Sequence, residues 1–327
     1  MNKPLVTTIH LSLILTVWLA WYFLSPAPAF SYIAQHWQVT VTMIFGSLIA
    51  GGTSEGGGAV AFPVFTKVLD ISPHAAKVFS LAIQSVGMTA AAITILLMRI
   101  TVEWRAILLV SIGGIPGITM GSIIIAPLLP PEVIRITFTA MLSGLAITLI
   151  ILNRGIRSRN ETIPYLKGNE NIILIGVGLA GGILSGLVGN GIDIFTFSVL
   201  VLFFRVCEKV ATPTSVILMA VNALSGFFIH GVLLGDFTAQ IQNYWLAAIP
   251  VVVLGAPLGA LLCRHIKAEI IALFLIFLIG AELLTSLILI PLTAPVLAFG
   301  VGTFIFYFLL YFQMYRNRTY EVPHEKT

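Results

Sequence analysis

Two carboxylates stand inside glycine-rich breaks in otherwise uncharged, apolar sequence. Glu55 belongs to GGTSEGGG (51–58), and Asp193 belongs to GLVGNGID (186–193). A carboxylate at membrane depth is costly and is usually kept for an ion pathway or a proton relay. Carboxylates also favour helix N-termini, so each could cap a helix that begins beside it. We expect Glu55 and Asp193 to carry proton or ion coupling, with capping as the alternative role.

The same two motifs offer backbone groups to a ligand. Half-helices that begin near Gly56 and Gly191 would present free amides and a positive dipole end, which suit an anion, and glycine lets the backbone approach it closely. On the helix that follows each motif, Ser80, Gln84 and Gly87 share one face, as do Ser215, Met219 and Asn222. The predicted ligand-binding residues are Thr53, Ser54, Gly56, Gly57, Ser80, Gln84, Asn190, Gly191, Ser215 and Asn222. For the serines, ordinary packing between membrane helices is the alternative.

The elements that position these residues must be membrane helices. The 327 residues are 58% hydrophobic and 9% charged, whereas about 25% of residues are charged in a soluble domain. The sequence therefore predicts an all-α integral membrane protein. Uncharged stretches long enough to span a bilayer lie at about 5–24, 78–98, 106–129, 136–153, 210–235, 237–263, 270–290 and 296–315.

Two further segments, 39–66 and 172–204, are interrupted near their middle by the glycine motifs. An unbroken helix over either range would reach about 42 or 50 Å, longer than a hydrocarbon core of about 30 Å. Re-entrant hairpins that return to their own side fit better. They leave only Lys67, Lys77 and Arg135 of the 17 lysines and arginines outside, in keeping with the positive-inside rule.

The chain also repeats itself. At one constant offset, Gly46, Gly51 and Gly56 superpose on Gly181, Gly186 and Gly191, and Ser80 superposes on Ser215. Each repeat, about 39–153 and about 172–290, would hold one hairpin and three spanning helices, and this odd number of crossings inverts the second copy. One extra helix flanks each end, at 5–24 and 296–315, and residues 1–327 form a single transmembrane domain.

The sequence carries no metal-spaced histidine pair, no nucleophile paired with histidine and no Walker-type loop. We therefore expect no enzyme, no cofactor and no bound metal. His10, His74 and His230 stand alone and are interpreted as structural or interfacial. The formal net charge of +4 comes from loops beside helices, so it does not indicate a nucleic-acid partner. Residues 1–29 fit a retained first helix better than a cleaved signal peptide.

The paired motifs resemble those of the sulfite exporter TauE/SafE family of membrane transporters. The likeness lies in GSLIAGGTSEGGGAVAFPVF (46–65) with ISPHAAKVFS (71–80), and in GLAGGILSGLVGNGIDIFTFSVL (178–200) with ATPTSVILM (211–219). It implies a carrier of small sulfur-containing anions such as sulfite or a sulfonate.

We therefore predict a secondary transporter whose repeats rock around the two hairpin tips. Its partners would be a small anionic solute and the lipid bilayer, and the sequence allows a homo-oligomer. A multi-pass protein of the cell inner membrane or plasma membrane, with a cytoplasmic C-terminus, is expected. The alternatives are an ion channel or cation carrier that uses the intramembrane carboxylates and, in another class, a membrane-embedded enzyme or receptor.

Overall fold

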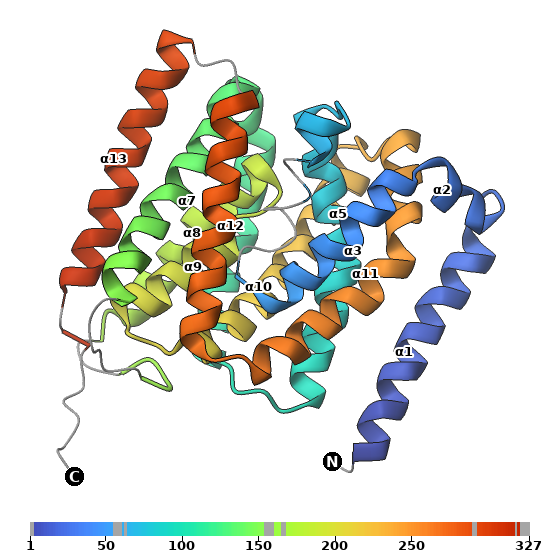
Figure 1. Ribbon diagram of the computed structural model, residues 1–327, viewed down its shortest axis with the longest axis horizontal. Coiled ribbons are helices and arrows are strands. Elements are labelled where there is room, and N and C mark those ends of the chain that lie inside the picture. Colours follow the sequence, from blue (N-terminus) through green and yellow to red (C-terminus); the bar gives the residue numbers. More distant parts are fainter. Residues whose placement is uncertain are drawn as a thin grey trace.

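The structure is a bundle of helices that run mostly along one common direction (Figure 1). It is a computed structural model that describes residues 3–54, 61, 64–153, 160–164, 168–289, 293–317 and 319–320. Every regular element in this part of the chain is helical. Glu55, Gly56 and Gly57, which belong to the predicted first tip, lie outside the described residues.

The elements follow one another along the chain as α-helices interrupted by short π- and 3₁₀-helical turns (η). They are α1 (Lys3–Leu24), α2 (Ala29–Gln35), α3 (Trp37–Gly52), η1 (Val64–Val68), α5 (Pro73–Leu97), α6 (Trp104–Met120), η2 (Gly121–Ile125), η3 (Ala126–Leu128), α7 (Pro131–Asn153), α8 (Glu170–Val188), α9 (Ile192–Ser198), η4 (Val199–Phe203), α10 (Glu208–Phe228), η5 (Ile229–Leu233), α11 (Ala239–His265), α12 (Ala268–Leu289) and α13 (Ala294–Arg316).

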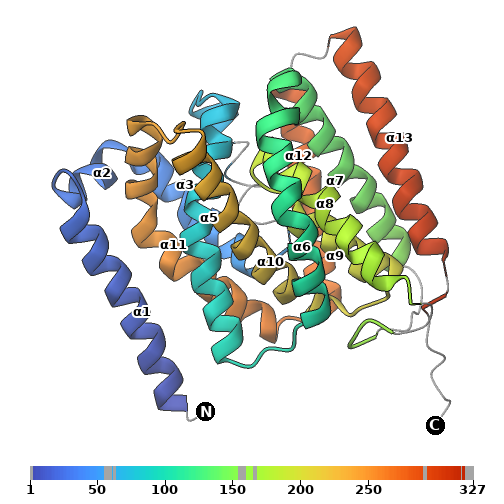
Figure 2. The same cartoon turned by 180° about the vertical axis from the view of Figure 1, so that it is seen from behind.

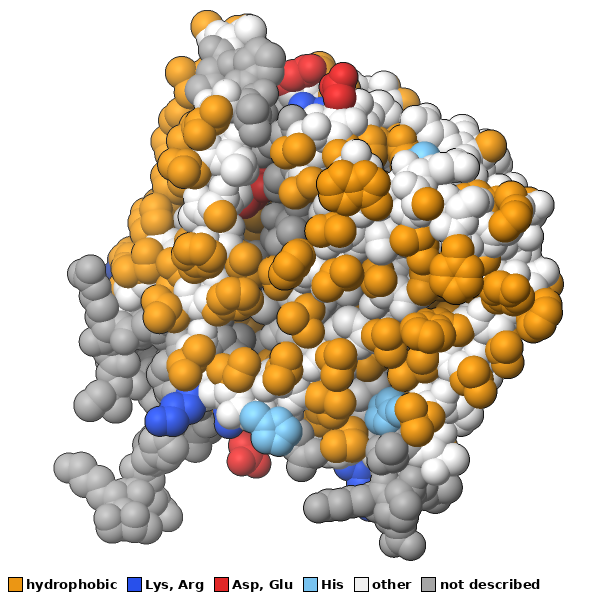
Figure 3. All heavy atoms as spheres, turned by 45° about the vertical axis from the view of Figure 1, so that its right-hand side comes forward, with side chains coloured by type: hydrophobic (Ala, Val, Ile, Leu, Met, Phe, Trp, Pro, Cys, Tyr) orange, Lys and Arg blue, Asp and Glu red, His pale blue; other side chains and the backbone are white. Residues whose placement is uncertain are grey.

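The prediction of an all-helical membrane protein is confirmed. Within the described ranges, seven helices are long and apolar enough to cross a bilayer, and α1 with α2, bent by 90°, makes up to eight. Figure 3 shows hydrophobic side chains over the middle of one face, with most charged side chains near its upper and lower margins. This is the pattern of a belt in contact with lipid, with polar groups kept near the two interfaces.

Helix boundaries follow from local capping. The sequence predicts a helix from about residue 78, but α5 begins at Pro73, because the Ser72 hydroxyl accepts the Ala75 N–H at 3.3 Å and Pro73 takes the first helical position. Thr238 begins α11 in the same way, accepting the Ile241 N–H at 3.5 Å. α2 was not predicted as a helix.

The second broken segment is a hairpin that returns to its own end of the molecule. α8 has 19 residues, whereas α9 and η4, with 7 and 5 residues, together reach only about 18 Å. At the start of α8, the Glu170 carboxylate accepts the Tyr320 hydroxyl at 3.1 Å, and the Tyr320 ring lies 5.0 Å from the ring of Phe204, just after η4. The start and the end of the segment therefore lie together, as predicted.

α8, the first limb of the second hairpin, packs on α6, and α3, which leads to the predicted first tip, packs on α11. In each pair the partner belongs to the other predicted repeat. Glycines bring the backbones together. A Cβ at Gly178 would lie 2.1 Å from the carbonyl oxygen of Val110, and one at Gly259 would lie 2.1 Å from that of Leu48. In α6 and η2, three further glycines make such close backbone approaches to α8: Gly113, Gly117 and Gly121.

α5 and α10 pack against each other at the centre of the bundle, and each also contacts a helix of the opposite repeat, α5 with α11 and α10 with α6. Figures 1 and 2 show the same central position of α10 from the two sides. If the two predicted repeats are exchanged, the contact of α5 with α11 becomes that of α10 with α6, and the contact of α3 with α11 becomes that of α8 with α6. These matching contacts favour an inverted repeat, and the inverted orientation itself stays a prediction.

Candidate functional site

The second hairpin tip is a tight, buried turn closed by its own side chains. Gly189 ends α8 with a left-handed backbone (φ +84°), a conformation that favours glycine. Ser185 accepts the Ile192 N–H at 3.0 Å through its hydroxyl oxygen. Asp193, 1% exposed, accepts the Gly191 N–H at 3.2 Å through Oδ1. The tip is therefore self-capped.

This geometry corrects one prediction. The sequence predicts free amides at the start of the half-helix near Gly191, but the amides of Gly191 and Ile192 are taken by Asp193 and Ser185. A short polar side chain beside a helix start satisfies the donors there, so they are not left for a ligand. Asp193 performs the capping role that the sequence left as its alternative, and its other oxygen, Oδ2, has no hydrogen-bond partner among the described residues.

α5 holds this tip from the other repeat. The Gln84 amide nitrogen donates to the Gly189 carbonyl at 3.3 Å and to the Ser80 hydroxyl. The Ser80 hydroxyl donates to the same carbonyl at 3.4 Å. One turn nearer the start of α5, the Lys77 ammonium donates to the Gly186 carbonyl at 3.3 Å. The structure thus brings Ser80, Gln84 and the second tip together.

The predicted residues of α10 are buried as well. The Ser215 hydroxyl donates to the Thr212 carbonyl in its own helix at 2.8 Å. Asn222, 3% exposed, points its Oδ1 toward Gly114 of α6, where a Cβ would lie 3.5 Å from that oxygen and 2.5 Å from Ile192 Cδ1. Asn222 thus lies close to the start of α9.

At the first tip, the described residues end at Ser54. The Thr53 hydroxyl donates to the Ile49 carbonyl at 3.0 Å, and both Thr53 and Ser54 are buried. Asn190 of the second tip is also buried, at 2% exposed. The predictions for Glu55, Gly56 and Gly57 fall on residues that the structure does not describe.

Two cavities lie at opposite ends of the α5–α10 pair. The far cavity, of about 460 Å³, is lined by the start of α5 (Pro73, His74, Lys77) and by the chain after α10 (His230, Leu234, Asp236), together with Ser122, Arg135 and Leu187. The near cavity, of about 340 Å³, is lined by the other end of α5 (Ile95, Arg99) and the start of α10 (Lys209, Val210, Thr212), together with Gly51, Glu161, Cys207 and Cys263. The near cavity lies at the end of the molecule where α1 begins and α13 ends (Figure 1).

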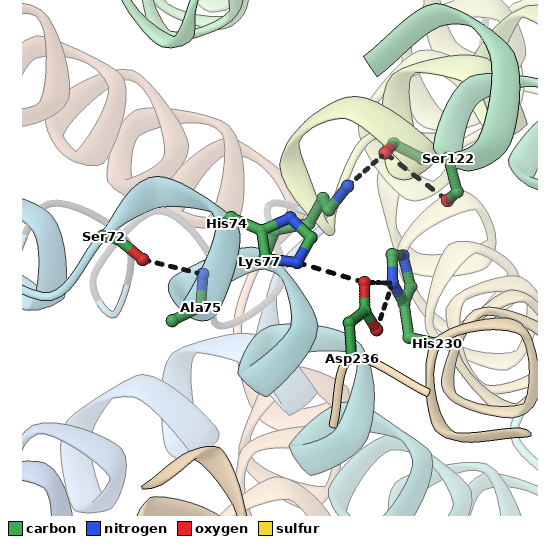
Figure 4. A network of polar contacts seen from close by, with 8 residues as sticks. Ser72, His74, Ala75, Lys77, Ser122, His230 and Asp236 are labelled. Atoms are coloured by element: carbon green, nitrogen blue, oxygen red, sulfur yellow. Dashed lines mark hydrogen bonds and ion pairs between the residues drawn. The ribbon is translucent and has the colours of Figure 1, made fainter. Parts of the chain in front are cut away.

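The far cavity holds a cluster that sequence analysis missed. The Asp236 carboxylate lies 3.0 Å from His74 Nε2 and 3.0 Å from His230 Nδ1 (Figure 4). The prediction that His74 and His230 stand alone is therefore wrong. They lie far apart in sequence, and only the antiparallel packing of α5 with α10 brings them to one end.

The structure has helices that are long and apolar enough to cross a bilayer, and a buried break between α8 and α9. Polar cavities lie at both ends of the α5–α10 pair. This arrangement is that of a membrane transporter. The family model of the sulfite exporter TauE/SafE matches residues 39–285, so the chain belongs to this family. No curated protein and no solved structure matches the chain.

Membership of the family makes the chain a multi-pass membrane transporter of sulfur anions and not an enzyme. The match covers both glycine motifs and ends within α12, leaving α1, α2 and α13 outside it.

Proposed function

We propose that this protein is a secondary transporter of a small sulfur oxyanion or organosulfonate, with the substrate passing between the two hairpin tips. The observation that carries the proposal is the placement of the cavities. Gly51, beside the first tip, lines the near cavity, and Leu187, beside the second tip, lines the far cavity. Residues beside the two glycine motifs thus line two different cavities.

The charges of the cavities support an anionic substrate. Arg99 and Lys209 line the near cavity, and Lys77 and Arg135 line the far cavity. Basic side chains raise the local concentration of anions and offer charge-assisted hydrogen bonds to their oxygens. Between the cavities, the side-chain amides of Gln84 and Asn222 can present either their NH₂ group or their oxygen to a ligand by rotating.

Alternating access would arise because helices of each predicted repeat pack on helices of the other. Since α8 rests on α6 and α3 on α11, a small rotation of one pair against the other would widen one cavity and narrow the other. Because Asp193 already occupies the amide of Gly191, an anion gains that position only when the carboxylate leaves or is neutralised. Protonation of Asp193 would neutralise this carboxylate, and protonation of Glu55 would remove the negative charge of the first glycine motif. Either step would couple the anion to a proton.

The proposed setting is the cell inner membrane or plasma membrane, with the near cavity and the C-terminus on the cytoplasmic side. The positive-inside rule is then satisfied, because Arg99, Lys209 and most of the lysines and arginines that do not line the far cavity lie on the cytoplasmic side. A homo-oligomer is compatible with this arrangement.

The test is uptake by proteoliposomes of sulfite, methanesulfonate and sulfate, with and without an inward proton gradient. We expect uphill accumulation of at least one sulfur anion. Gly191→Leu should abolish uptake because its Cβ would lie 2.6 Å from Leu184 Cβ in the first limb, and Gly57→Leu should act in the same way at the first tip. Gly280→Leu in α12, where a Cβ would meet nothing within 4 Å, is the matched control.

The rival function, a channel or cation carrier that uses the carboxylates, gives a different result. A channel would dissipate an anion gradient without accumulating the solute, and a cation carrier would leave all three anions outside. Either outcome would overturn the proposal.

A further inference from the structure

The polar side chains of the far cavity form a connected cluster. Both histidines share one acceptor, Asp236, which lies on the short connection between η5 and α11. His74 is on α5 and 57% exposed at its side chain, while the His230 side chain is 1% exposed. The cluster therefore joins an accessible imidazole to a fully buried one.

Two buried nitrogens in this cavity have no hydrogen-bond partner among the described residues, Arg135 Nε and His230 Nε2. Arg135 Nε is a donor, and His230 Nε2 becomes one when the imidazole is protonated, because Nδ1 already faces the Asp236 carboxylate. Lys77 is 4% exposed, and its hydrogen bond to the Gly186 carbonyl leaves further N–H groups on the ammonium. Burying cationic or donor groups without partners is unfavourable, and a bound anion would remove this cost.

The charges that face the cavity also favour an anion. Lys77 and Arg135 are opposed by Asp236, and Glu132 flanks Arg135 on α7. When His74 and His230 are neutral, the lining cations exceed the lining Asp236 by one charge. When both imidazoles are protonated, the excess grows to three charges, and both nitrogens of His230 become donors.

We propose that the far cavity is a binding site for a small oxyanion, held by Lys77, Arg135 and His230, and that the His74–Asp236–His230 bridge makes its affinity rise as the pH falls. A cavity of about 460 Å³ accommodates a tetrahedral or pyramidal oxyanion with several waters. The Lys77 contact to Gly186 joins this site to the second tip. The identification of the anion as a sulfur oxyanion rests on the proposed function, whereas the site itself does not.

The experiment is titration calorimetry of the purified full-length protein with sulfate, from about pH 8 to about pH 5, a range that extends well below the ordinary histidine pKa of about 6.5. Sulfate stays fully ionised over this range, so any pH dependence belongs to the protein. We expect tighter binding at low pH. Lys77→Gln, which keeps a donor for the Gly186 carbonyl, should weaken binding at every pH by about ten- to a hundredfold, the loss expected for one charge-assisted hydrogen bond.

Two further variants separate charge from structural damage. The double variant His74→Gln and His230→Gln should abolish the pH dependence. Asp236→Asn removes the opposing charge, so sulfate should bind it more tightly than wild type at pH 8, a gain that misfolding cannot produce. His36→Gln is the matched control, because His36 lies at the same end against Tyr244 and outside the cavity lining. Gel filtration and thermal unfolding establish that each variant is folded.

Wild-type affinity in Lys77→Gln, or an unchanged pH dependence in the double histidine variant, would overturn the site. These failures differ from failure of the proposed function. A protein that accumulates sulfite but binds sulfate equally in all variants has the transport activity without the site. A protein that binds sulfate as described but accumulates no sulfur anion has the site without the transport activity.

Discussion

Asp193 could act both as a helix cap and as a proton carrier. It is buried beside the tip, and one of its oxygens caps the half-helix while the other has no partner among the described residues. A cap needs only an acceptor, whereas a proton carrier needs a group that ionises. Substitutions that remove these properties one at a time can therefore separate the roles.

Asp193→Asn keeps an oxygen that can accept the Gly191 N–H but cannot ionise. If Asp193 carries the coupled proton, this variant should lose accumulation driven by a pH gradient and still exchange labelled substrate across the membrane, because binding and rocking do not need the charge. Asp193→Ala loses the cap too and should be less stable than Asp193→Asn by about 0.5–2 kcal/mol. Both fluxes are measured in proteoliposomes, and wild-type accumulation in Asp193→Asn would exclude the proton role.

Glu55 occupies the corresponding motif of the first repeat and receives the same test. Glu55→Gln keeps the size and the carbonyl acceptor, so a residue that only caps should tolerate it with a modest loss of stability, about 0.5–2 kcal/mol. A proton carrier would instead lose gradient-driven uptake while keeping exchange. Comparing Glu55→Gln with Asp193→Asn assigns the proton to one tip, and unaltered accumulation in both variants would end the proton hypothesis for the tips.

At the scale of elements, the glycine spacing predicts which faces of the helices pack together, but it does not predict how closely their backbones approach each other. Gly176 and Gly178 lie two residues apart in α8, and the difference between them is structural. A Cβ at Gly178 would meet the Val110 carbonyl at 2.1 Å, whereas a Cβ at Gly176 would meet nothing within 4 Å. Backbone cannot move aside as a flexible side chain can, so these two positions should respond differently to the same change.

Gly178→Leu should therefore lower the free energy of unfolding by about 1–3 kcal/mol or more, the range for overpacking. Gly176→Leu should leave stability within about 0.5 kcal/mol, as at an exposed position. Thermal unfolding in the same detergent compares the two variants with wild type. Equal destabilisation would contradict the close packing of α8 on α6.

Most element boundaries followed from hydropathy, since a spanning helix needs a long uncharged run. The expected helix at 136–153 became α7, Pro131–Asn153, and the one at 296–315 became α13, Ala294–Arg316. What hydropathy could not give was the capping of α5 at Ser72, the π-helical turns that end α6 and α10, and the self-capped tip. These depend on single hydrogen bonds rather than on the average polarity of a segment.

At the scale of the whole molecule, the repeat relates the two cavities. Gly51 and Gly186, equivalent by sequence, lie beside opposite cavities: Gly51 lines the near cavity, and Gly186 accepts from Lys77 of the far cavity. An inverted repeat predicts such a pair of sites. It could not predict their contents: a carboxylate lines each cavity, Glu161 and Asp236, but among the described residues histidines line only the far cavity. The far cavity is therefore the more specialised of the two.

The orientation of this asymmetric molecule gives the last prediction. With the near end in the cytoplasm, a membrane-impermeant thiol reagent applied to whole cells should not label native Cys207, which lines the near cavity, nor Ser158→Cys or Thr327→Cys. Leu129→Cys in the far cavity, made in a Cys207→Ser and Cys263→Ser background, should react from outside. Inside-out vesicles should give the reverse pattern, which also establishes that unlabelled cysteines are reactive.

Each other labelling pattern would lead to one conclusion about the topology. Asn160, between the two expected helices, forms a bridge with Val206 at the end of the second hairpin. Its side-chain amide also donates to the Tyr320 carbonyl at 2.9 Å, so Asn160 and Tyr320 lie at the same end of the molecule. The loop and the C-terminus must then be labelled together or not at all. Labelling of both from outside would reverse the orientation and turn the far cavity toward the cytoplasm. Labelling of Ser158→Cys without Thr327→Cys would contradict the hairpins themselves, because only a segment that crosses the membrane could separate the two.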